Sequence, residues 1–356
     1  MIHKNKYVLP ILLVVQIVVV QIISCFPIAV ESFYSNGFYK KTSLFLRFFF
    51  QKIPFSVGDS LYFVILFFVL KWFWKIKYSW KTEAKNHIIT ILSFFSIFYF
   101  CFHLMWGLNY YRQPLFEKMA IQKDYSIQDL TFFTQKLIQK TNSVQFEITK
   151  NKSKKIKFPY TQNQVFEMNL NGFSNLSKEY KYFSYYNLCV KKSLFSVPLA
   201  YMGFAGYLNP FSNEAQINYL MPNYNLPTTT CHEMAHQIGF ASESECNFIG
   251  FLASIKNNNL YFQYSGYSFA LRYCMATLKK QDEKLAQTLL LKINHGVLEN
   301  YKESDLFWSQ YETPIEQGFA FFYDHFLKIN QQNDGLEGYS KFVNLMVNFY
   351  KTNQLS

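Results

Sequence analysis

Charged residues are scarce in this chain: they make up 16% of its 356 residues, whereas half of the residues are apolar and a fifth are aromatic. Such a composition argues against an intrinsically disordered protein, which combines low hydrophobicity with high charge. The apolar residues crowd into the first 111 positions, which argues against a single soluble globule. We therefore predict a membrane region at 1–111 and a soluble domain at 112–356, which is long enough to bury its own core.

The six cysteines include no C-x-x-C pair, which argues against a cysteine zinc finger or a thioredoxin-type motif. The formal charge of +12 is likewise not accompanied by any signature of a nucleic-acid-binding module. Much of the positive charge lies beside apolar segments, where lysines set membrane topology and contact anionic lipid. We expect a lipid bilayer, and no nucleic acid, among the partners of the chain.

Three apolar stretches in the membrane region predict transmembrane helices near 8–30, 57–74 and 88–108. Lysines precede the first stretch and fill the short loop between the second and the third, and the positive-inside rule places both in the cytoplasm. The loop between the first two stretches is also basic, so this rule is followed only in part. It favours a multi-pass protein with a cytoplasmic N-terminus and an extracytoplasmic C-terminal domain.

The first stretch allows an alternative, because Ile22-Ile23-Ser24-Cys25 resembles the end of a lipoprotein signal with Cys25 as the lipidated residue. Cleavage there would leave the other two stretches as a helical hairpin and the C-terminal domain on the same side. The apolar run continues past Cys25, which favours an intact membrane helix.

The region after residue 111 predicts a mainly α-helical, α+β domain with a small hairpin or sheet. Apolar residues at 129–140 have the spacing of one helix face, and most of the chain from residue 245 onward is helical in pattern. The lysine-rich segment 151–157 is predicted to be a solvated loop.

The segment before residue 230 predicts a hairpin followed by a helix. Residues 204–208 and 214–220 lie on either side of Asn209-Pro210, which predicts two short strands joined by a turn. Pro227 and the three threonines after it are a typical helix start, because proline is well tolerated in the first turn.

This predicted helix contains the pattern H-E-x-x-H, as His232-Glu233-Met234-Ala235-His236. Histidines four residues apart lie on one helix face, so both imidazoles can reach the same metal ion. Glu233 can take a proton from a water molecule at the open side of the metal and later pass it to a leaving amine. The pattern predicts a catalytic Zn²⁺ site that hydrolyses a peptide or protein substrate, with Glu233 as general base.

A catalytic zinc ion usually has a third protein ligand. The arrangement with a third histidine is excluded, because Ser242 stands at the required position after Gly239. Glu243 and Glu245 remain as candidates, and a second helix that starts near Ser242 would carry Glu245 back toward the ion. We prefer Glu245, although Ser242 and Glu245 also fit a capping box. Asn247 is a candidate for orienting a metal ligand through a hydrogen bond.

Four segments carry a resemblance to a known family, at 54–59, 106–112, 206–218 and 232–248. They are similar to a bacterial membrane-protein family, the domain of unknown function 3810. The resemblance spans nearly the whole chain and implies a membrane region in the bacterial inner membrane, followed by a zincin-like domain with peptidase activity. It implies no substrate.

The same resemblance bears on three residues of the metal region. The element Glu245-Cys246-Asn247 is similar to the metal-site helix of glutamate zincins, which supports Glu245 as the third ligand. Cys231 and Cys246 stand where the family has small residues. A disulfide between them and a pair of buried thiols both remain open.

The expected activity is that of a membrane-anchored zinc metallopeptidase. One alternative is a catalytically inactive zinc-binding or scaffold protein, which the intact Glu233 disfavours. Another is an intramembrane metalloprotease, which the polar composition of 222–244 disfavours. The sequence leaves the oligomeric state open, and spacing does not choose a transition-state donor from four later residues: His295, His325, Tyr264 and Tyr267.

Overall fold

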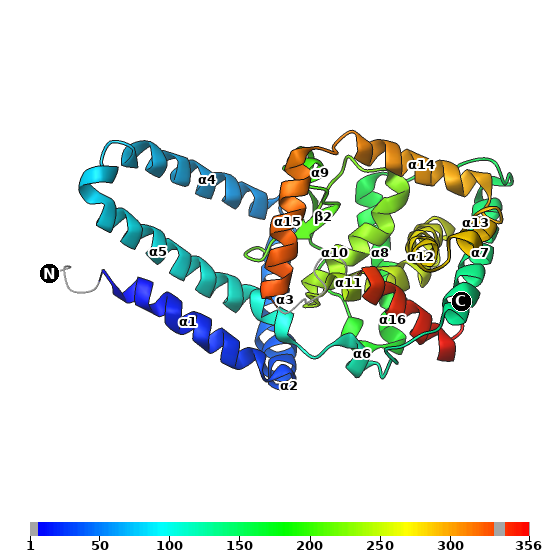
Figure 1. Ribbon diagram of the computed structural model, residues 1–356, viewed down its shortest axis with the longest axis horizontal. Helices are drawn as coiled ribbons and strands as arrows, with labels where there is room; N and C mark the ends of the chain where they lie inside the picture. The colour runs from blue at the N-terminus through cyan, green and yellow to red at the C-terminus, as the bar shows by residue number, and fades with distance from the viewer. Residues whose placement is uncertain (1–5, 331–338, 356) are drawn as a thin grey trace. The chain divides into compact units, whose positions relative to one another are not determined.

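The computed structural model describes residues 6–330 and 339–355, and the chain forms two compact units (Figure 1). The first unit comprises Met1–Gln113 and Asn209–Glu214, and the second comprises Pro114–Leu208 and Ala215–Ser356. The described residues are mostly helical and contain one small sheet. A division near residue 111 was expected from the sequence, but the inclusion of the short segment 209–214 in the first unit was not.

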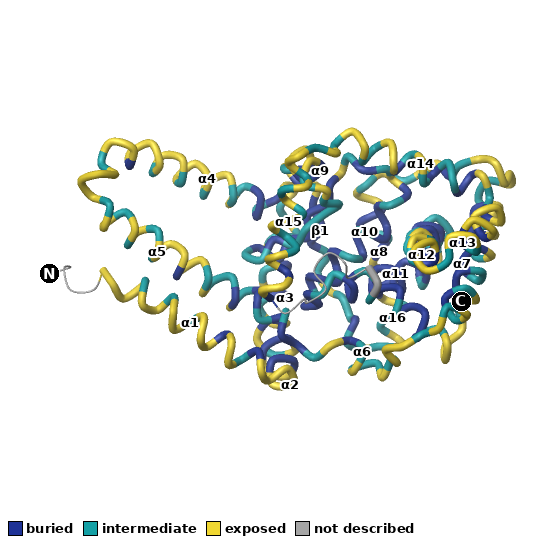
Figure 2. Tube along the Cα trace, in the orientation of Figure 1, coloured by how far each residue is buried: buried dark blue, intermediate teal, exposed yellow. Residues whose placement is uncertain are grey.

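The first unit is built entirely from helices and their connections within the described residues. In chain order they are α1 (Val8–Ser24), α2 (Pro27–Ala29), the π-helix η1 (Val30–Tyr39), α3 (Lys40–Phe50), α4 (Val57–Ile76), α5 (Trp80–Met105) and the 3₁₀ helix η2 (Gly107–Tyr111). α1 packs along α5, and α4 and α5 are joined by a short turn (Figure 1). Most apolar residues of α1, α4 and α5 are exposed (Figure 2), as expected for helices whose outer surface meets lipid.

Two helices, α4 and α5, are long and apolar enough to cross a membrane. A third span is present if α1 and the continuous helical run Pro27–Phe50, made of α2, η1 and α3, count as one bent span. The expectation of one continuous helix at 8–30 is wrong, because α1 ends at Ser24 and the chain bends by 96° before the helix Pro27–Phe50. Pro27 explains the break: proline disfavours helical backbone at the preceding residue, and Phe26 lies outside the helical region with φ −123° and ψ 64°. The third expected span begins earlier than predicted, at Trp80.

A buried ion pair ties η1 to the end of the first unit. Arg112 donates two hydrogen bonds to Glu31, from Nε to Oε2 at 2.7 Å and from Nη2 to Oε1 at 2.8 Å. Ser35 on η1 also donates a hydrogen bond to Asn109 Oδ1 at 2.9 Å. A bidentate pair is strong because both charges are satisfied at once, whereas loss of either partner leaves a buried charge. Residues 106–112 therefore act as an anchor of the first unit.

The segment 209–214 caps the N-terminus of α4. The Glu214 carboxylate accepts hydrogen bonds from the backbone N–H groups of Val57 at 3.1 Å and Gly58 at 2.6 Å, and from Ser212 Oγ at 2.9 Å. Ser56 Oγ accepts a further bond from Asp59 N at 2.9 Å. The first N–H groups of a helix have no partner within the helix and carry partial positive charge, so a buried carboxylate suits them. This arrangement accounts for Ser56, which is the N-cap residue of α4.

Glu214→Ala should destabilise the first unit by about 2–4 kcal/mol, because two N–H donors at the start of α4, one of them buried, would lose a charged acceptor. The measurement is thermal unfolding of the full chain in detergent, in which the midpoint should fall. The exposed Glu147 provides the control, since Glu147→Ala should leave the midpoint unchanged. Equal midpoints for both variants would show that the Glu214 cap contributes nothing.

The second unit contains the sheet and the remaining helices. In chain order they are α6 (Leu115–Lys118), α7 (Ile127–Thr149), α8 (Gln162–Glu179), η3 (Lys181–Phe183), β1 (Val190–Lys192), α9 (Ser196–Tyr201), β2 (Gly206–Leu208), β3 (Ala215–Ile217), η4 (Asn223–Asn225), α10 (Leu226–Gln237), α11 (Glu243–Ile255), α12 (Leu260–Gln281), α13 (Glu283–Leu290), α14 (His295–Ser309), α15 (Pro314–Ile329) and α16 (Tyr339–Thr352). α11 packs on α10, α8, α12 and α16, and α12 also packs on α7. An apolar core lies between these helices, so α10 and α11 are held by buried contacts on several sides.

The sheet has the strand order β1-β3-β2. β2 and β3 are antiparallel, with Tyr207 opposite Gln216, and β1 adds to β3 in parallel, with Lys191 also opposite Gln216. The predicted hairpin at 204–208 and 214–220 is confirmed, with shorter strands than expected. Its turn is stabilised by Asn209 Oδ1, which accepts hydrogen bonds from two following backbone N–H groups. No pattern in the sequence predicted β1.

The predicted helices of the second unit are also confirmed. The helix expected at 129–140 is the central part of α7, which begins with a capping box between Ser126 and Asp129. The lysine-rich segment 151–157 lies outside helices and strands, as expected. Pro227 lies in the first turn of α10, and Gly239 follows its end with φ 93°, a left-handed conformation that glycine adopts without strain.

Candidate metal centre

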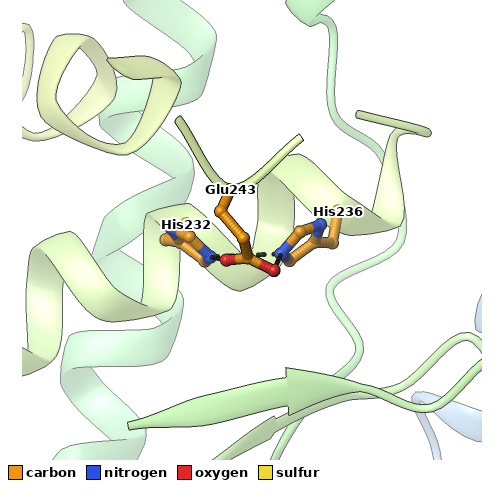
Figure 3. A group of neighbouring side chains, drawn as sticks. All are labelled: His232, His236 and Glu243. Carbon is orange, nitrogen blue, oxygen red and sulfur yellow. Dashed lines mark hydrogen bonds and ion pairs between the residues drawn. The ribbon is translucent and has the colours of Figure 1, made fainter. Parts of the chain in front are cut away.

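α10 presents both histidines of the H-E-x-x-H pattern on one face (Figure 3). The Nε2 atoms of His232 and His236 are 3.1 Å apart. This separation places both ring nitrogens around one point, as expected for residues one helical turn apart. Each can serve as one ligand atom of a shared metal ion.

Glu243, the first residue of α11, completes a cluster of three (Figure 3). Its Oε2 is 3.2 Å from His232 Nε2, and its Oε1 is 3.7 Å from His236 Nε2. The ligand atoms of the three residues all lie within 4.8 Å of one another. Two imidazole nitrogens and a carboxylate oxygen form a possible metal-binding group.

The structure brings Glu243, and not the preferred Glu245, to the histidines. Glu245 Oε1 instead accepts a hydrogen bond of 2.6 Å from the backbone N–H of Leu115. Glu243 and Glu245 cannot both face the histidines, because residues two apart on a helix point about 200° apart around its axis. The capping-box alternative is also not observed, because the Ser242 side chain makes no capping hydrogen bond at the start of α11.

The other ring nitrogen of each histidine is held by a separate partner. His232 Nδ1 donates to Asn247 Oδ1 at 2.8 Å, and His236 Nδ1 donates to the backbone carbonyl of Phe240 at 2.8 Å. A hydrogen bond from Nδ1 fixes the ring orientation and leaves Nε2 as the free ligand atom. Asn247, which the sequence suggested as an orienting residue, lies in contact with His232.

Glu233 lies beside the cluster and is almost fully buried, with 4% of its surface exposed. Its Oε2 atom is buried and has no hydrogen-bond partner among the described residues. Strand β2 lies against it, because a Cβ atom on Gly206 would be 2.7 Å from Glu233 Oε1. Burial raises the pKa of the Glu233 carboxyl, and the nearby His232 and His236 offset this only in part. A carboxylate with a raised pKa is well suited to exchange protons near neutral pH.

Side chains of the cluster shift one another's pKa values. Burial alone would raise the pKa of Glu243, but hydrogen bonds and charge from His232 and His236 outweigh it and hold that pKa well below its ordinary value. Burial likewise opposes protonation of His236, yet the neighbouring Cys246 and Glu243 raise its pKa well above the ordinary value. A metal ion bound to these ligands would compete with protons for the same nitrogen and oxygen atoms.

Both cysteines of this region are free thiols. Cys231 donates to Asn169 Oδ1 at 3.1 Å, and Cys246 donates to the Phe240 carbonyl at 3.1 Å. Burial raises the pKa of Cys231 to about 12 and that of Cys246 to about 11, so both are protonated at neutral pH. The structure therefore has small buried thiols here and no disulfide between them.

One residue that contacts the cluster was missed in the sequence analysis. Tyr323 donates a hydrogen bond to Glu243 Oε1 at 2.6 Å across 80 positions of the chain. The four donors considered from the sequence have other surroundings: His295 faces Glu299, His325 faces the Phe321 carbonyl, Tyr264 donates to Asn300, and Tyr267 lies in the core. No local sequence pattern marks Tyr323, because its role depends on the packing of α15.

The fold and the cluster define a mostly helical protein with apolar helices fit to cross a membrane and a possible metal-binding group in its second unit. Residues 34–347 match the model of a family described as a protein of unknown function, DUF3810. The chain therefore belongs to this family. Comparison with curated proteins and with solved structures finds no match.

Glu243→Ala and Glu245→Ala should separate the two candidate ligands. We expect Glu243→Ala to weaken Zn²⁺ binding by at least about 10-fold, because an oxygen ligand is lost. Glu245→Ala should retain the wild-type affinity and lower the unfolding midpoint, because the Leu115 N–H loses its acceptor. The measurement is competition of the full chain in detergent against a chelator of known affinity. Weak binding by Glu245→Ala alone would reverse the assignment.

Proposed function

We propose that this chain is a membrane-anchored, zincin-like metallopeptidase that uses Zn²⁺ held by His232, His236 and Glu243. The observation that carries the proposal is the buried, unpaired Oε2 of Glu233 beside this ligand set. An unpaired buried carboxylate oxygen costs free energy, so its retention calls for a functional reason. Such a reason exists if Glu233 is a general base, because its oxygen would then accept a proton from a water molecule bound at the metal site.

The ligand set fits zinc. Two neutral imidazoles and one carboxylate are typical protein ligands of a catalytic zinc ion, which keeps a fourth position open. When bound, zinc supplies a Lewis acid that polarises the scissile carbonyl and favours ionisation of water. Asn247 and the Phe240 carbonyl hold the two rings so that their Nε2 atoms converge.

Glu233 is the residue that moves the proton in this proposal. Its carboxylate takes a proton from the attacking water as the carbon–oxygen bond forms, and donates it to the amine nitrogen as the carbon–nitrogen bond breaks. Burial raises the pKa of the Glu233 carboxyl, which makes its carboxylate a stronger base than an exposed one.

The position of β2 favours an extended peptide as substrate. β2 lies at one edge of the described sheet and packs against Glu233 through Gly206. An extended peptide can add to a sheet edge through main-chain hydrogen bonds. A peptide placed along β2 would bring a backbone carbonyl close to the general base.

The proposed location is the bacterial cytoplasmic membrane, with the N-terminus in the cytoplasm and the second unit outside. Two or three helices apolar enough to span a membrane support the anchoring, and the distribution of lysines supports the orientation. The 12-residue helix α10, which bears the histidines, is not among the candidate spans, so an intramembrane protease is not favoured.

Glu233→Gln should retain zinc and reduce hydrolysis by at least about 100-fold, because the general base is lost and the ligands remain. The assay incubates the full chain in detergent with a mixture of peptides, identifies products by mass spectrometry, and measures zinc by elemental analysis. His236→Ala should lose both zinc and hydrolysis, whereas the exposed His295→Ala should keep both.

Two outcomes of this assay contradict parts of the proposal. Wild-type protein that binds zinc and cleaves no peptide would favour the non-catalytic zinc-binding alternative. Cleavage by Glu233→Gln at the wild-type rate would show that another group is the base.

The proposed orientation predicts that a reporter fused to the C-terminus is active outside the cytoplasm. An alkaline phosphatase fusion should be active and a green fluorescent protein fusion dark, because alkaline phosphatase folds only after export. A fluorescent fusion with inactive phosphatase would place the second unit in the cytoplasm.

A further inference from the structure

α15 approaches the metal cluster from a part of the chain remote from the H-E-x-x-H pattern. Its residue Tyr323 donates a hydrogen bond of 2.6 Å to Oε1 of Glu243. This oxygen also faces His236 Nε2 at 3.7 Å, while Oε2 faces His232. A hydroxyl that donates to an ionised carboxylate at this distance makes a strong, charge-assisted bond.

The ring of Tyr323 is held on two sides. It meets the ring of Phe204 edge to face, with centroids 4.9 Å apart and an interplanar angle of 84°, and stacks with Phe326 at 6.2 Å and 15°. Phe204 directly precedes the segment that leads into β2, and its carbonyl accepts a hydrogen bond from Asn218 at 3.2 Å. Packing of the ring on two neighbours restricts its rotamers, so the direction of the hydroxyl is set in advance.

A second contact holds α15 against the same segment. A Cβ atom on Gly203 would lie 3.5 Å from Cγ of Glu316, so this side chain reaches the backbone just before Phe204. Glu316 and Tyr323 are seven residues apart, which places them on one face of α15, two turns from each other. That face of α15 therefore joins the segment before β2 to the start of α11.

Glu243 is the ligand that most needs such support. Its side chain is 32% exposed, against 14% for His232 and 8% for His236. A long side chain at a helix start retains several rotamers, and ordering it opposes metal binding. Both histidines already have an orienting partner, in Asn247 and the Phe240 carbonyl.

We propose that Tyr323 is a positioning residue that orients the Glu243 carboxylate for the metal ion. This inference rests on the proposed metal site and adds to it a residue from outside the α10–α11 pair. Each of the three ligands then has a hydrogen bond to a different part of the second unit: His232 to α11, His236 to the segment between α10 and α11, and Glu243 to α15. Tyr323 acts on the metal through Glu243, so its hydroxyl should contribute to affinity without being a ligand.

The test is Tyr323→Phe in the full chain, because this change removes the hydroxyl and keeps the ring against Phe204. The apparent Kd for Zn²⁺, measured by competition with a chelator in detergent, should rise about 10- to 100-fold. The d–d absorption of the Co²⁺-loaded protein should also change, because the carboxylate is no longer held in one orientation. Tyr186→Phe is the matched control, since Tyr186 is exposed and the same hydroxyl is removed.

The outcomes are distinct. Wild-type protein that binds no zinc would overturn the proposed function and, with it, this inference. Wild-type protein that binds zinc, with an unchanged Kd and an unchanged Co²⁺ spectrum in Tyr323→Phe, would overturn the inference alone. If Tyr323→Phe unfolds at a lower temperature, the Co²⁺ spectrum of its folded fraction decides, because a change of packing elsewhere would leave the ligand geometry as in the wild type.

Discussion

The site depends on one feature, the reversal of the chain between α10 and α11. Gly239 takes a left-handed conformation two residues after the end of α10, and four residues later α11 begins with Glu243. This short return brings a carboxylate back to the helix face that carries His232 and His236. A longer connection between α10 and α11 would not by itself hold the Glu243 carboxylate close to the histidines.

The rest of the second unit holds this arrangement in place. Buried helices pack on α11 from several sides and fix the helix that carries Glu243. Each proposed ligand then has its own hydrogen-bond partner: Asn247 for His232, the Phe240 carbonyl for His236, and Tyr323 for Glu243. Metal sites depend on such partners, because these set the tautomer and direction of the ligand atoms. The Oε2 atom of Glu233, the proposed general base, is buried and has no hydrogen-bond partner among the described residues.

Local patterns in the sequence predicted the features that depend on local geometry. The two histidines, the helix start at Pro227, the end at Gly239 and the hairpin turn at Asn209 all follow from residue type and spacing. The break after α1 also had a local signal in Pro27, but the length of the apolar run outweighed it in the prediction. Membrane helices tolerate proline often enough that its presence does not decide the matter.

The remaining features depend on packing between distant segments. The choice between Glu243 and Glu245 turns on the residue at which α11 begins, and helix boundaries are the least certain part of a sequence-based prediction. β1 is a parallel partner of β3 and is separated from it by a helix and another strand, so no turn pattern marks it. Tyr323 contacts Glu243 across 80 positions, and only the packing of α15 brings them together.

The central claim is that one metal ion lies between His232, His236 and Glu243. A crystal structure of the zinc-loaded protein with data collected at the zinc absorption edge tests it most directly. The account predicts a single strong anomalous peak about 2.0–2.2 Å from both Nε2 atoms and from a Glu243 oxygen. A peak bound by Glu245, or no peak between the two histidines, would contradict it.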